Sequence, residues 1–225
     1  MMKHAVRTQS FVDGIRQEFD DLVTVANRDT EFIDLNDPEA VPLPVMKNFD
    51  NNGLDMAHDL AFHDNRYSWV GNTMRMIPVV FGCSAVAMAE LRDLNRHRTG
   101  SKLVSLIPVG FYLPVEQVPD DNSVDMARKL GNLEGLRSFG AKMSNRAIQL
   151  LQQGDPTYLY WLPLGAQFMF AHVTTAEKFI YEAELRTGVG AHFRYAKHLR
   201  DILELWYESQ PDTKGLILEG SAEPE

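Results

Sequence analysis

The sequence predicts an α+β fold in which helices dominate. Three observations support this class: long segments carry apolar residues at helical spacing, shorter segments rich in β-branched and aromatic residues lie between them, and 44% of the 225 residues are hydrophobic. This content can bury one sizeable core, either in one large domain or in two small ones in close contact. Without internal repeats, we expect a single domain over residues 1–215 and a loose tail at 216–225.

The first part of the chain, residues 10–94, divides into five predicted segments. Ser10 begins a predicted helix over 10–26, whose apolar residues form one stripe. The proline-rich stretch 36–53 is expected to be an extended connection, and 54–71 has no clear pattern. Residues 74–82 predict a short strand despite Pro78. Ser84 is then expected to open a helix over 85–94.

The middle of the chain alternates between strand and helix patterns. Residues 102–118 are rich in β-branched and aromatic residues, and their prolines limit them to edge strands and turns. A helical stripe follows over 122–152, but its glycines each cost about 1 kcal/mol relative to alanine, so we expect a break. Residues 154–173 predict strand segments, with Phe168 and Phe170 on one face.

Two helices are predicted near the C-terminus. Thr174 and Glu177 have the spacing of a capping box, which predicts a helix start at this point. A last helix carries apolar residues at helical spacing from Phe193 to Trp206. Pro211 forbids its continuation.

The composition excludes several classes of protein. The formal net charge is −9, with 22 basic and 31 acidic residues, so general binding to nucleic acid or to an anionic membrane is not expected. The single cysteine, Cys83, rules out an intramolecular disulfide framework. No segment has the apolar pattern of a signal peptide or of a membrane span, and we expect a cytoplasmic protein.

Common catalytic and metal motifs are missing from the sequence. His58 and His63 are five apart, about 140° around a helix, and form no zinc motif. There is no nucleophile elbow, no phosphate-binding loop and no dinucleotide fingerprint. No metal site is predicted, and no residue is assigned a covalent catalytic role.

The arginines are the remaining candidates for a binding site. Arg92, Arg96 and Arg98 cluster at the end of one predicted helix, and Arg186 ends another in the stretch EAELRTGVGAH. Guanidinium groups recognise phosphates and carbonyls with two parallel hydrogen bonds. Cations at a helix C-terminus are also stabilised by the backbone dipole without any ligand. Spacing alone leaves both interpretations open.

Several stretches resemble the flavin-dependent thymidylate synthases, the ThyX family. Arg96-His97-Arg98-Thr99-Gly100-Ser101 is in register with the first half of the signature R-H-R-x-x-S-x-N-E-x-S-x-R-Y. FYLP at 111–114 is similar to the strand that follows the signature, and LPL at 162–164 begins a block that aligns through Arg186. The resemblance covers roughly residues 75–208 and is strongest at these two blocks.

The resemblance implies a fold, a reaction and an assembly. The fold would be a small, mostly antiparallel sheet with long helices. The reaction would convert dUMP, or a related uracil nucleotide, to dTMP, with FAD as cofactor and with NADPH and methylenetetrahydrofolate as co-substrates. The implied assembly is a homotetramer with flavin sites at subunit interfaces, or a complex with a ThyX homologue.

The resemblance also implies binding roles for particular residues. Cationic donors suit the FAD phosphates and the electron-rich ring of reduced flavin, and the helix-terminal arginine suits the uracil ring. The implied flavin-binding residues are Arg96, His97, Arg98, Ser101 and His192, and the implied substrate-binding residues are Arg186 and Arg92.

The second half of the signature differs from the family. Residues 103–109 read LVSLIPV where the family has N-E-x-S-x-R-Y, and Met169, Thr175 and Asp93 replace an arginine, an asparagine and a glutamine. An aspartate near a nucleotide phosphate would repel it. Three hypotheses follow: a divergent FAD-dependent thymidylate synthase or related pyrimidine methyltransferase, a non-catalytic ThyX-like subunit that partners a catalytic homologue, and an unrelated helical interaction protein.

Overall fold

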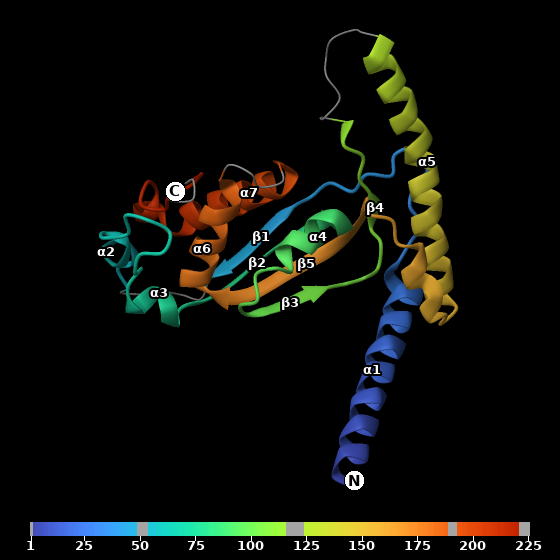
Figure 1. Ribbon diagram of the computed structural model, residues 1–225, viewed down its shortest axis with the longest axis horizontal. Helices are drawn as coiled ribbons and strands as arrows, with labels where there is room; N and C mark the ends of the chain where they lie inside the picture. Colours follow the sequence, from blue (N-terminus) through green and yellow to red (C-terminus); the bar gives the residue numbers. More distant parts are fainter. Residues whose placement is uncertain (1, 49–53, 116–123, 189–192, 221–225) are drawn as a thin grey trace. The chain divides into compact units, whose positions relative to one another are not determined.

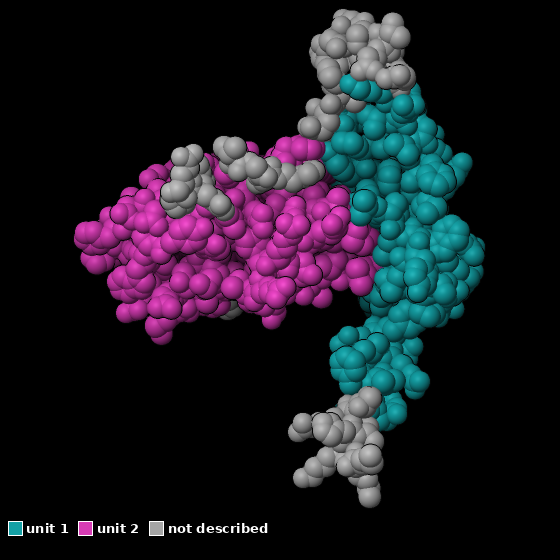
Figure 2. Space-filling view, viewed as in Figure 1, with its two compact units in different colours: residues 1–40, 107–167 teal, residues 41–106, 168–225 magenta. Residues whose placement is uncertain are grey.

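The structure, a computed structural model, describes residues 2–48, 54–115, 124–188 and 193–220. It divides into two compact units (Figure 2). Unit 1 contains residues 1–40 and 107–167, and unit 2 contains residues 41–106 and 168–225. Within the described residues, no helix is both long enough and apolar enough to cross a membrane.

Unit 1 is built on two long helices, α1 and α5, which pack near their C-terminal ends (Figure 1). The Asn27 amide donates to the Gln152 carbonyl, and Asn145 pairs with the backbone of Ile33, so the two segments run antiparallel. The apolar cluster between them consists of Ala26, Ile107, Ala147, Leu150, Leu151 and Tyr158. The elements of unit 1 are α1 (Met2–Asp29), β4 (Gly110–Phe111), α5 (Val124–Gln152) and the 3-10 helix η2 (Pro156–Trp161).

Two predictions about these helices are wrong. Helix α1 begins at Met2, well before the predicted cap at Ser10. Helix α5 is continuous over 29 residues and has no break at its glycines. Gly131 has open space around it and costs only about 1 kcal/mol, whereas Gly140 lies against the Phe111 ring, where a Cβ atom would clash. Packing of the C-terminal half of α5 therefore outweighs the low helix propensity of its glycines.

Unit 2 is built on a small antiparallel sheet, as predicted. Strand β1 pairs antiparallel with β2, and β3 pairs antiparallel with β5; β5 begins in unit 1, where its first two residues pair with β4. Phe168 and Phe170 are buried while Met169 is exposed, so the predicted alternation is confirmed. The strands, in spatial order, are β1 (Pro44–Asn48), β2 (Pro78–Ala87), β5 (Ala166–Thr175) and β3 (Ser101–Val104).

Helices α6 and α7 pack on this sheet and on each other (Figure 1). An aromatic series, Phe81, Phe179 and Trp206, joins β2 to these helices, with successive ring centroids 5.0 and 5.4 Å apart. The apolar stripe of α7 ends before Pro211, as predicted. The helices of unit 2 are α2 (Met56–Leu60), α3 (Asn72–Met76), α4 (Met88–Leu94), α6 (Ala176–Thr187), α7 (Phe193–Ser209) and the 3-10 helix η3 (Pro211–Thr213).

The boundary between β2 and α4 differs from the prediction. The strand continues to Ala87, and α4 begins only at Met88. Ser84, the predicted helix cap, instead accepts a hydrogen bond from the Leu43 N–H at 2.8 Å and donates to the Val41 carbonyl. The Ser84 side chain therefore joins its strand to residues 41–43 and does not cap a helix.

Three smaller differences concern the remaining boundaries. Strand β1 lies inside the stretch 36–53 that was expected to be a simple connection. Helix α6 starts close to the predicted point, but its N-cap is Thr175, which makes no side-chain cap. In the stretch 216–220, which we expected to be loose, Ile217 is buried and the Leu218 N–H donates to Glu184.

Candidate functional site

A series of neighbouring side chains in unit 2 joins the two arginine motifs. Arg186 Nε donates to His97 Nε2 at 2.8 Å, and His97 Nδ1 lies 4.0 Å from a carboxylate oxygen of Glu182. Because Nε2 accepts this hydrogen bond, the ring proton of a neutral His97 is on Nδ1, the side that faces Glu182. The acid, the imidazole and the guanidinium therefore form an ordered series.

Glu182 is the centre of this cluster. It is 1% exposed, and its Oε1 accepts a hydrogen bond from the Tyr195 hydroxyl at 2.9 Å. His172 Nδ1 lies 3.3 Å from the other carboxylate oxygen, and His172 Nε2 donates to the Thr99 carbonyl at 2.7 Å. Burial and the nearby carboxylate raise the pKa of Tyr195 well above its ordinary value, so the phenol remains a donor.

The His97 imidazole is neutral, and the cations of Arg186 and Lys102 act on it. Its side chain is buried, and burial lowers the pKa of the imidazole, an effect that the Glu182 carboxylate opposes and that Arg186 and Lys102 reinforce. A neutral imidazole can accept the hydrogen bond from Arg186, whereas an imidazolium could not. The stretch Arg96-His97-Arg98 is thus a pair of exposed cations around a buried acceptor.

A cavity of about 400 Å³ lies beside this cluster, between α4 and β3. Its polar lining comes from Arg92 and Asn95 at the end of α4 and from Lys102 on β3. The Lys102 ammonium donates to the carbonyls of His97 and Thr99, so this lysine belongs to both the cavity and the cluster. The apolar lining consists of Met88, Leu91, Val104, Leu106 and Phe170.

One residue of the cavity lining has a strained backbone. Leu106 has a φ of 51°, in the left-handed region that costs a residue with a Cβ atom about 1–2 kcal/mol. Its neighbour Ser105 donates to the Met169 carbonyl and keeps the chain beside β5. Strain of this kind persists only where the surroundings impose it, and it is often found at functional sites.

Two other buried acids in unit 2 form separate clusters. Glu90 lies 3.2 Å from Arg194 and 3.0 Å from His198. Its side chain also accepts a hydrogen bond from the Ala87 N–H. Glu184 lies 2.7 Å from His63. None of these residues lines the 400 Å³ cavity. Glu90 joins α4 to α7, and Glu184 joins α6 to the loop after α2, which is a structural role.

A larger hollow in unit 1 is a poor site for an anion. Its volume is about 560 Å³, and it is lined by segment 28–40 and residues 107–109. One cation, Arg28, faces five acidic side chains there, which would repel a phosphate. These acidic residues are Asp29, Glu31, Asp34, Asp37 and Glu39. Among the described residues, no group of histidine, cysteine and acidic side chains could hold a metal ion.

The arrangement of elements resembles that of a solved structure. A UMP/dUMP methylase, PolB, from Streptomyces cacaoi, solved with 5-Br UMP, matches with a TM-score of 0.57 and 13% identity, over 82% of this chain and 99% of that chain. Thymidylate synthase X (ThyX) from Helicobacter pylori, solved with FAD and dUMP, matches with a TM-score of 0.46 and 13% identity, over 78% and 97%. No family profile and no curated protein sequence matches.

The fold is ThyX-like.

Within this ThyX-like fold, the residues singled out from the sequence are only partly brought together. His97 and Arg186 are in direct contact, and Arg92 lines the adjacent cavity. Arg96 is exposed and lies 3.4 Å from Asp93. The remaining two described residues, Arg98 and Ser101, are exposed, while His192 lies outside the described residues.

Four residues of this candidate site were missed in the sequence. These are Lys102, His172, Glu182 and Tyr195. Glu182 is four positions before Arg186, a spacing that places both on one face of a helix and is visible in the sequence. The contacts of His172 and Tyr195 arise only when β5 and α7 pack beside α6, so nothing in their local sequence indicates them.

Proposed function

We propose that the protein binds a uracil nucleotide and FAD and methylates the nucleotide, dUMP or a relative such as UMP. The observation that carries this proposal is the contact of Arg186 with His97 beside a cavity lined by Arg92 and Lys102. The two motifs that resemble ThyX are 89 residues apart in the chain and meet at one place in unit 2. The ThyX-like fold supports the same assignment.

Arg186 is the proposed contact of the uracil ring. Its Nε is engaged by His97, so the terminal nitrogens of the guanidinium are left to donate to a carbonyl or an ionised ring nitrogen. The buried Glu182 lies 4.0 Å from His97 and balances the local positive charge. A guanidinium fixed in this way stabilises negative charge that develops on the pyrimidine as its carbon 5 attacks.

The residues present fit FAD in part. Arg96 and Arg98 are exposed cations at the end of α4, and the cavity offers an apolar floor beside Lys102, which suits a planar ring next to a phosphate. Ser101 and His192 are further proposed contacts. When bound, FAD would supply the reducing equivalents, with NADPH as their source and methylenetetrahydrofolate as the donor of the carbon.

A binding subunit without catalytic activity is the second candidate. Leu103 is 70% exposed and Met169 is 55% exposed, and both are apolar where the resemblance implies polar or cationic nucleotide contacts. Such a subunit would bind flavin or nucleotide and act with a catalytic ThyX homologue. The proposed assembly is a homotetramer or a complex with that homologue.

Nucleotide binding by the Arg186→Ala variant tests the proposal. Loss of a charge-assisted hydrogen bond costs about 1.5–3 kcal/mol, so we expect dUMP and UMP to bind roughly 10- to 100-fold more weakly in calorimetry. Arg75→Ala is the matched control, because Arg75 is an exposed arginine of unit 2 that pairs with Glu177 and lines no cavity described above. Its affinity should equal that of the parent protein.

The same preparation separates the two candidates. Transfer of a labelled one-carbon unit from methylenetetrahydrofolate to dUMP or UMP, dependent on FAD and NADPH, supports the methylase. Binding of FAD, seen as a change in its absorption spectrum, without such transfer supports the binding subunit. If neither nucleotide nor FAD binds, both candidates are wrong.

A further inference from the structure

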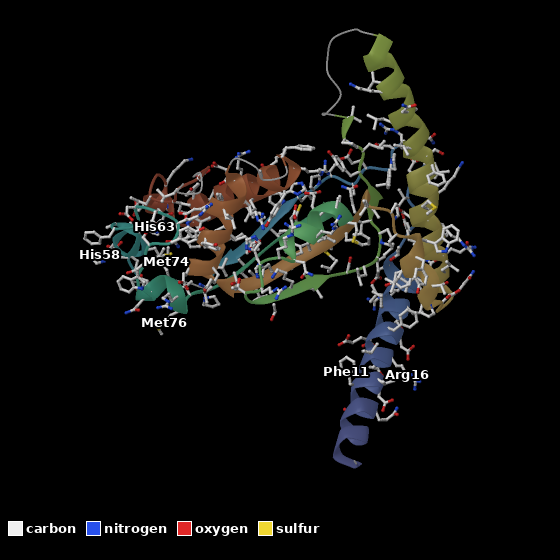
Figure 3. All side chains as sticks on the ribbon, viewed as in Figure 1. Phe11, Arg16, His58, His63, Met74 and Met76 are labelled. Carbon is white, nitrogen blue, oxygen red and sulfur yellow. The ribbon has the colours of Figure 1, made fainter. Side chains whose placement is uncertain are left out.

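The buried contact of Glu184 with His63 continues to a third side chain, Ser68. The Ser68 Oγ lies 2.9 Å from His63 Nδ1, and His63 Nε2 lies 2.7 Å from a carboxylate oxygen of Glu184. His63 and Ser68 belong to the loop between α2 and α3, where Figure 3 labels His63, and Glu184 belongs to α6. A hydroxyl, an imidazole and a carboxylate in this order are the groups of a serine nucleophile, its base and an orienting acid.

The contact with Glu184 decides which ring nitrogen of a neutral His63 carries the proton. The Glu184 side chain is buried, and its Oε1 also accepts a hydrogen bond from the Leu218 N–H at 2.9 Å. An ionised carboxylate only accepts hydrogen bonds, so His63 Nε2 carries the proton and Nδ1 presents its lone pair to Ser68. Glu184 therefore holds His63 in the tautomer that can take a proton from the serine.

A turn fixes the position of the Ser68 hydroxyl. Its Oγ lies 2.6 Å from the Asn65 carbonyl, and the Ser68 N–H donates to the same carbonyl at 2.8 Å. The hydroxyl has one proton, and rotation about the Cβ–Oγ bond directs it to either Asn65 or His63 without movement of heavier atoms. The same geometry therefore serves both a resting serine and one that gives its proton to His63.

A cavity of about 200 Å³ opens beside these residues. Both Ser68 and His63 line it, so the hydroxyl and its base face the same space. The rings of Tyr67 and Tyr181, whose centroids are 6.1 Å apart, and the side chain of Val70 supply apolar walls. A space of this size suits a small acyl group.

Two cations and one acid complete the lining of this cavity. Arg66 is 5% exposed, and the Lys178 ammonium lies 3.4 Å from the Glu177 carboxylate. Positive charge beside a nucleophile stabilises the oxyanion that forms when a hydroxyl attacks an acyl carbon. No lining residue is shared with the 400 Å³ cavity, so the two sites are separate.

We propose that this cavity is a second active site, which hydrolyses small carboxylic esters. Ser68 Oγ bonds to the acyl carbon and His63 Nδ1 takes the hydroxyl proton, which then passes to the departing alcohol as its bond to the acyl carbon breaks. Water next attacks the acyl-serine and gives a proton to His63. The carboxylic acid leaves as the proton returns to Ser68 Oγ. Glu184 positions His63 and stabilises the imidazolium.

Labelling with a fluorophosphonate tests the nucleophile. This reagent phosphonylates a serine that a base activates, whereas an ordinary hydroxyl is too weak a nucleophile. We expect one phosphonyl group at Ser68 in peptide mass spectra of the parent chain and none on Ser68→Ala. Ser209→Ala is the matched control, because the Ser209 hydroxyl also donates to the carbonyl three residues earlier and does not line the cavity. Its labelling should equal that of the parent.

Hydrolysis of p-nitrophenyl acetate measures turnover at the same site. Loss of a nucleophile or of a general base costs roughly 100-fold or more, so Ser68→Ala and His63→Asn should lower kcat by at least this factor. Circular dichroism checks that both variants fold. The Ser68 variant is the safer of the two, because Ser68 is only partly buried.

The Glu184→Gln variant separates positioning from packing. Glutamine keeps the shape and an acceptor oxygen for His63 and Leu218, and it removes only the charge. We expect kcat to fall roughly tenfold or more with KM nearly unchanged, because the imidazolium loses its counter-charge. If the contact only joins α6 to the loop, kcat stays at the parent value.

Two results would overturn the proposal. One is a parent chain that the fluorophosphonate does not label, or labels equally after Ser68→Ala. The other is ester hydrolysis that is the same in the parent and in Ser68→Ala. A doubly protonated His63 would produce both results, because an imidazolium donates to Ser68 and cannot take its proton. Neither measurement depends on nucleotide or flavin.

Discussion

Burial of a single residue, His97, changes the charge that its local sequence indicates. Between Arg96 and Arg98 it belongs to a cationic run, yet burial lowers the pKa of its imidazole, and it accepts a hydrogen bond from Arg186. The positive charge of the run is therefore limited to its two arginines. The charge that faces the cavity comes from Arg92 and Lys102 instead.

The lowered pKa of His97 predicts a pH dependence of stability. Its pKa in the unfolded chain is near the ordinary value of 6.5, so between the folded pKa and 6.5 the unfolded state binds more protons. The contribution of His97 is therefore fully present above about pH 6.5 and is lost as pH falls through this window. Urea unfolding at about pH 5 and about pH 7.5 should show a smaller loss for His97→Asn than for the parent.

Comparison with the variant is necessary because other titrating groups surround His97. Glu182, Arg186, Lys102 and His172 all act on its pKa and contribute to the total pH dependence. If His97→Asn loses as much stability as the parent on acidification, His97 is not the source of the predicted effect.

The sequence pointed to residues of the candidate site only where they belong to a recognisable motif. Arg92 and Arg186 were singled out as arginines at helix ends, and His97 through the resemblance to ThyX. Arg92 lines the cavity, and His97 and Arg186 are in contact with each other. Glu182 was missed because a single acidic residue on a helix is ordinary until burial removes its solvent. Lys102 was missed for a similar reason, since its role depends on the fold of the loop 97–99.

At the scale of elements, glycines have opposite roles in a turn and in a helix. Gly100 has a φ of 67°, and a Cβ atom there would clash with the Val173 carbonyl, so the turn into β3 requires glycine. Gly131 lies in α5 with open space around it. The first is needed by the fold, and the second only weakens its helix.

The two alanine substitutions should therefore change the free energy of unfolding in opposite directions. Gly100→Ala should lower it by at least about 1–2 kcal/mol through backbone strain alone. Gly131→Ala should raise it by about 0.5–1 kcal/mol, because alanine loses less backbone entropy in a helix. Urea denaturation of both variants measures these changes. A destabilised Gly131→Ala protein would show that this position is packed in solution.

Element types were easier to predict than element boundaries. The alternation in β5 and the stripe of α7 are local patterns, and both were identified correctly. The start of α4 was wrong because Ser84 bonds to the backbone of Val41 and Leu43, which no local pattern reveals. Helix α5 was expected to break because glycine propensity is local, whereas the packing that holds the helix together is not.

At the scale of the whole molecule, net charge opposes binding of polyanions. The formal net charge is −9, while the proposed nucleotide site is a small cationic region of unit 2. Fluorescence anisotropy with labelled duplex DNA should show no binding at physiological salt, whereas dUMP or UMP should bind. Tight, salt-dependent DNA binding would contradict this prediction and favour a different function.

Residue types and short spacings are enough to predict the α+β class, the helical stripes, the net negative charge and the two arginine motifs. These properties depend on residue type and on short spacings, which are present in any conformation of the chain. The contact of Arg186 with His97 and the burial of Glu182 beside them became visible only in the folded structure. Contacts between distant residues depend on how elements pack, and burial then sets the charge and the partners of each group.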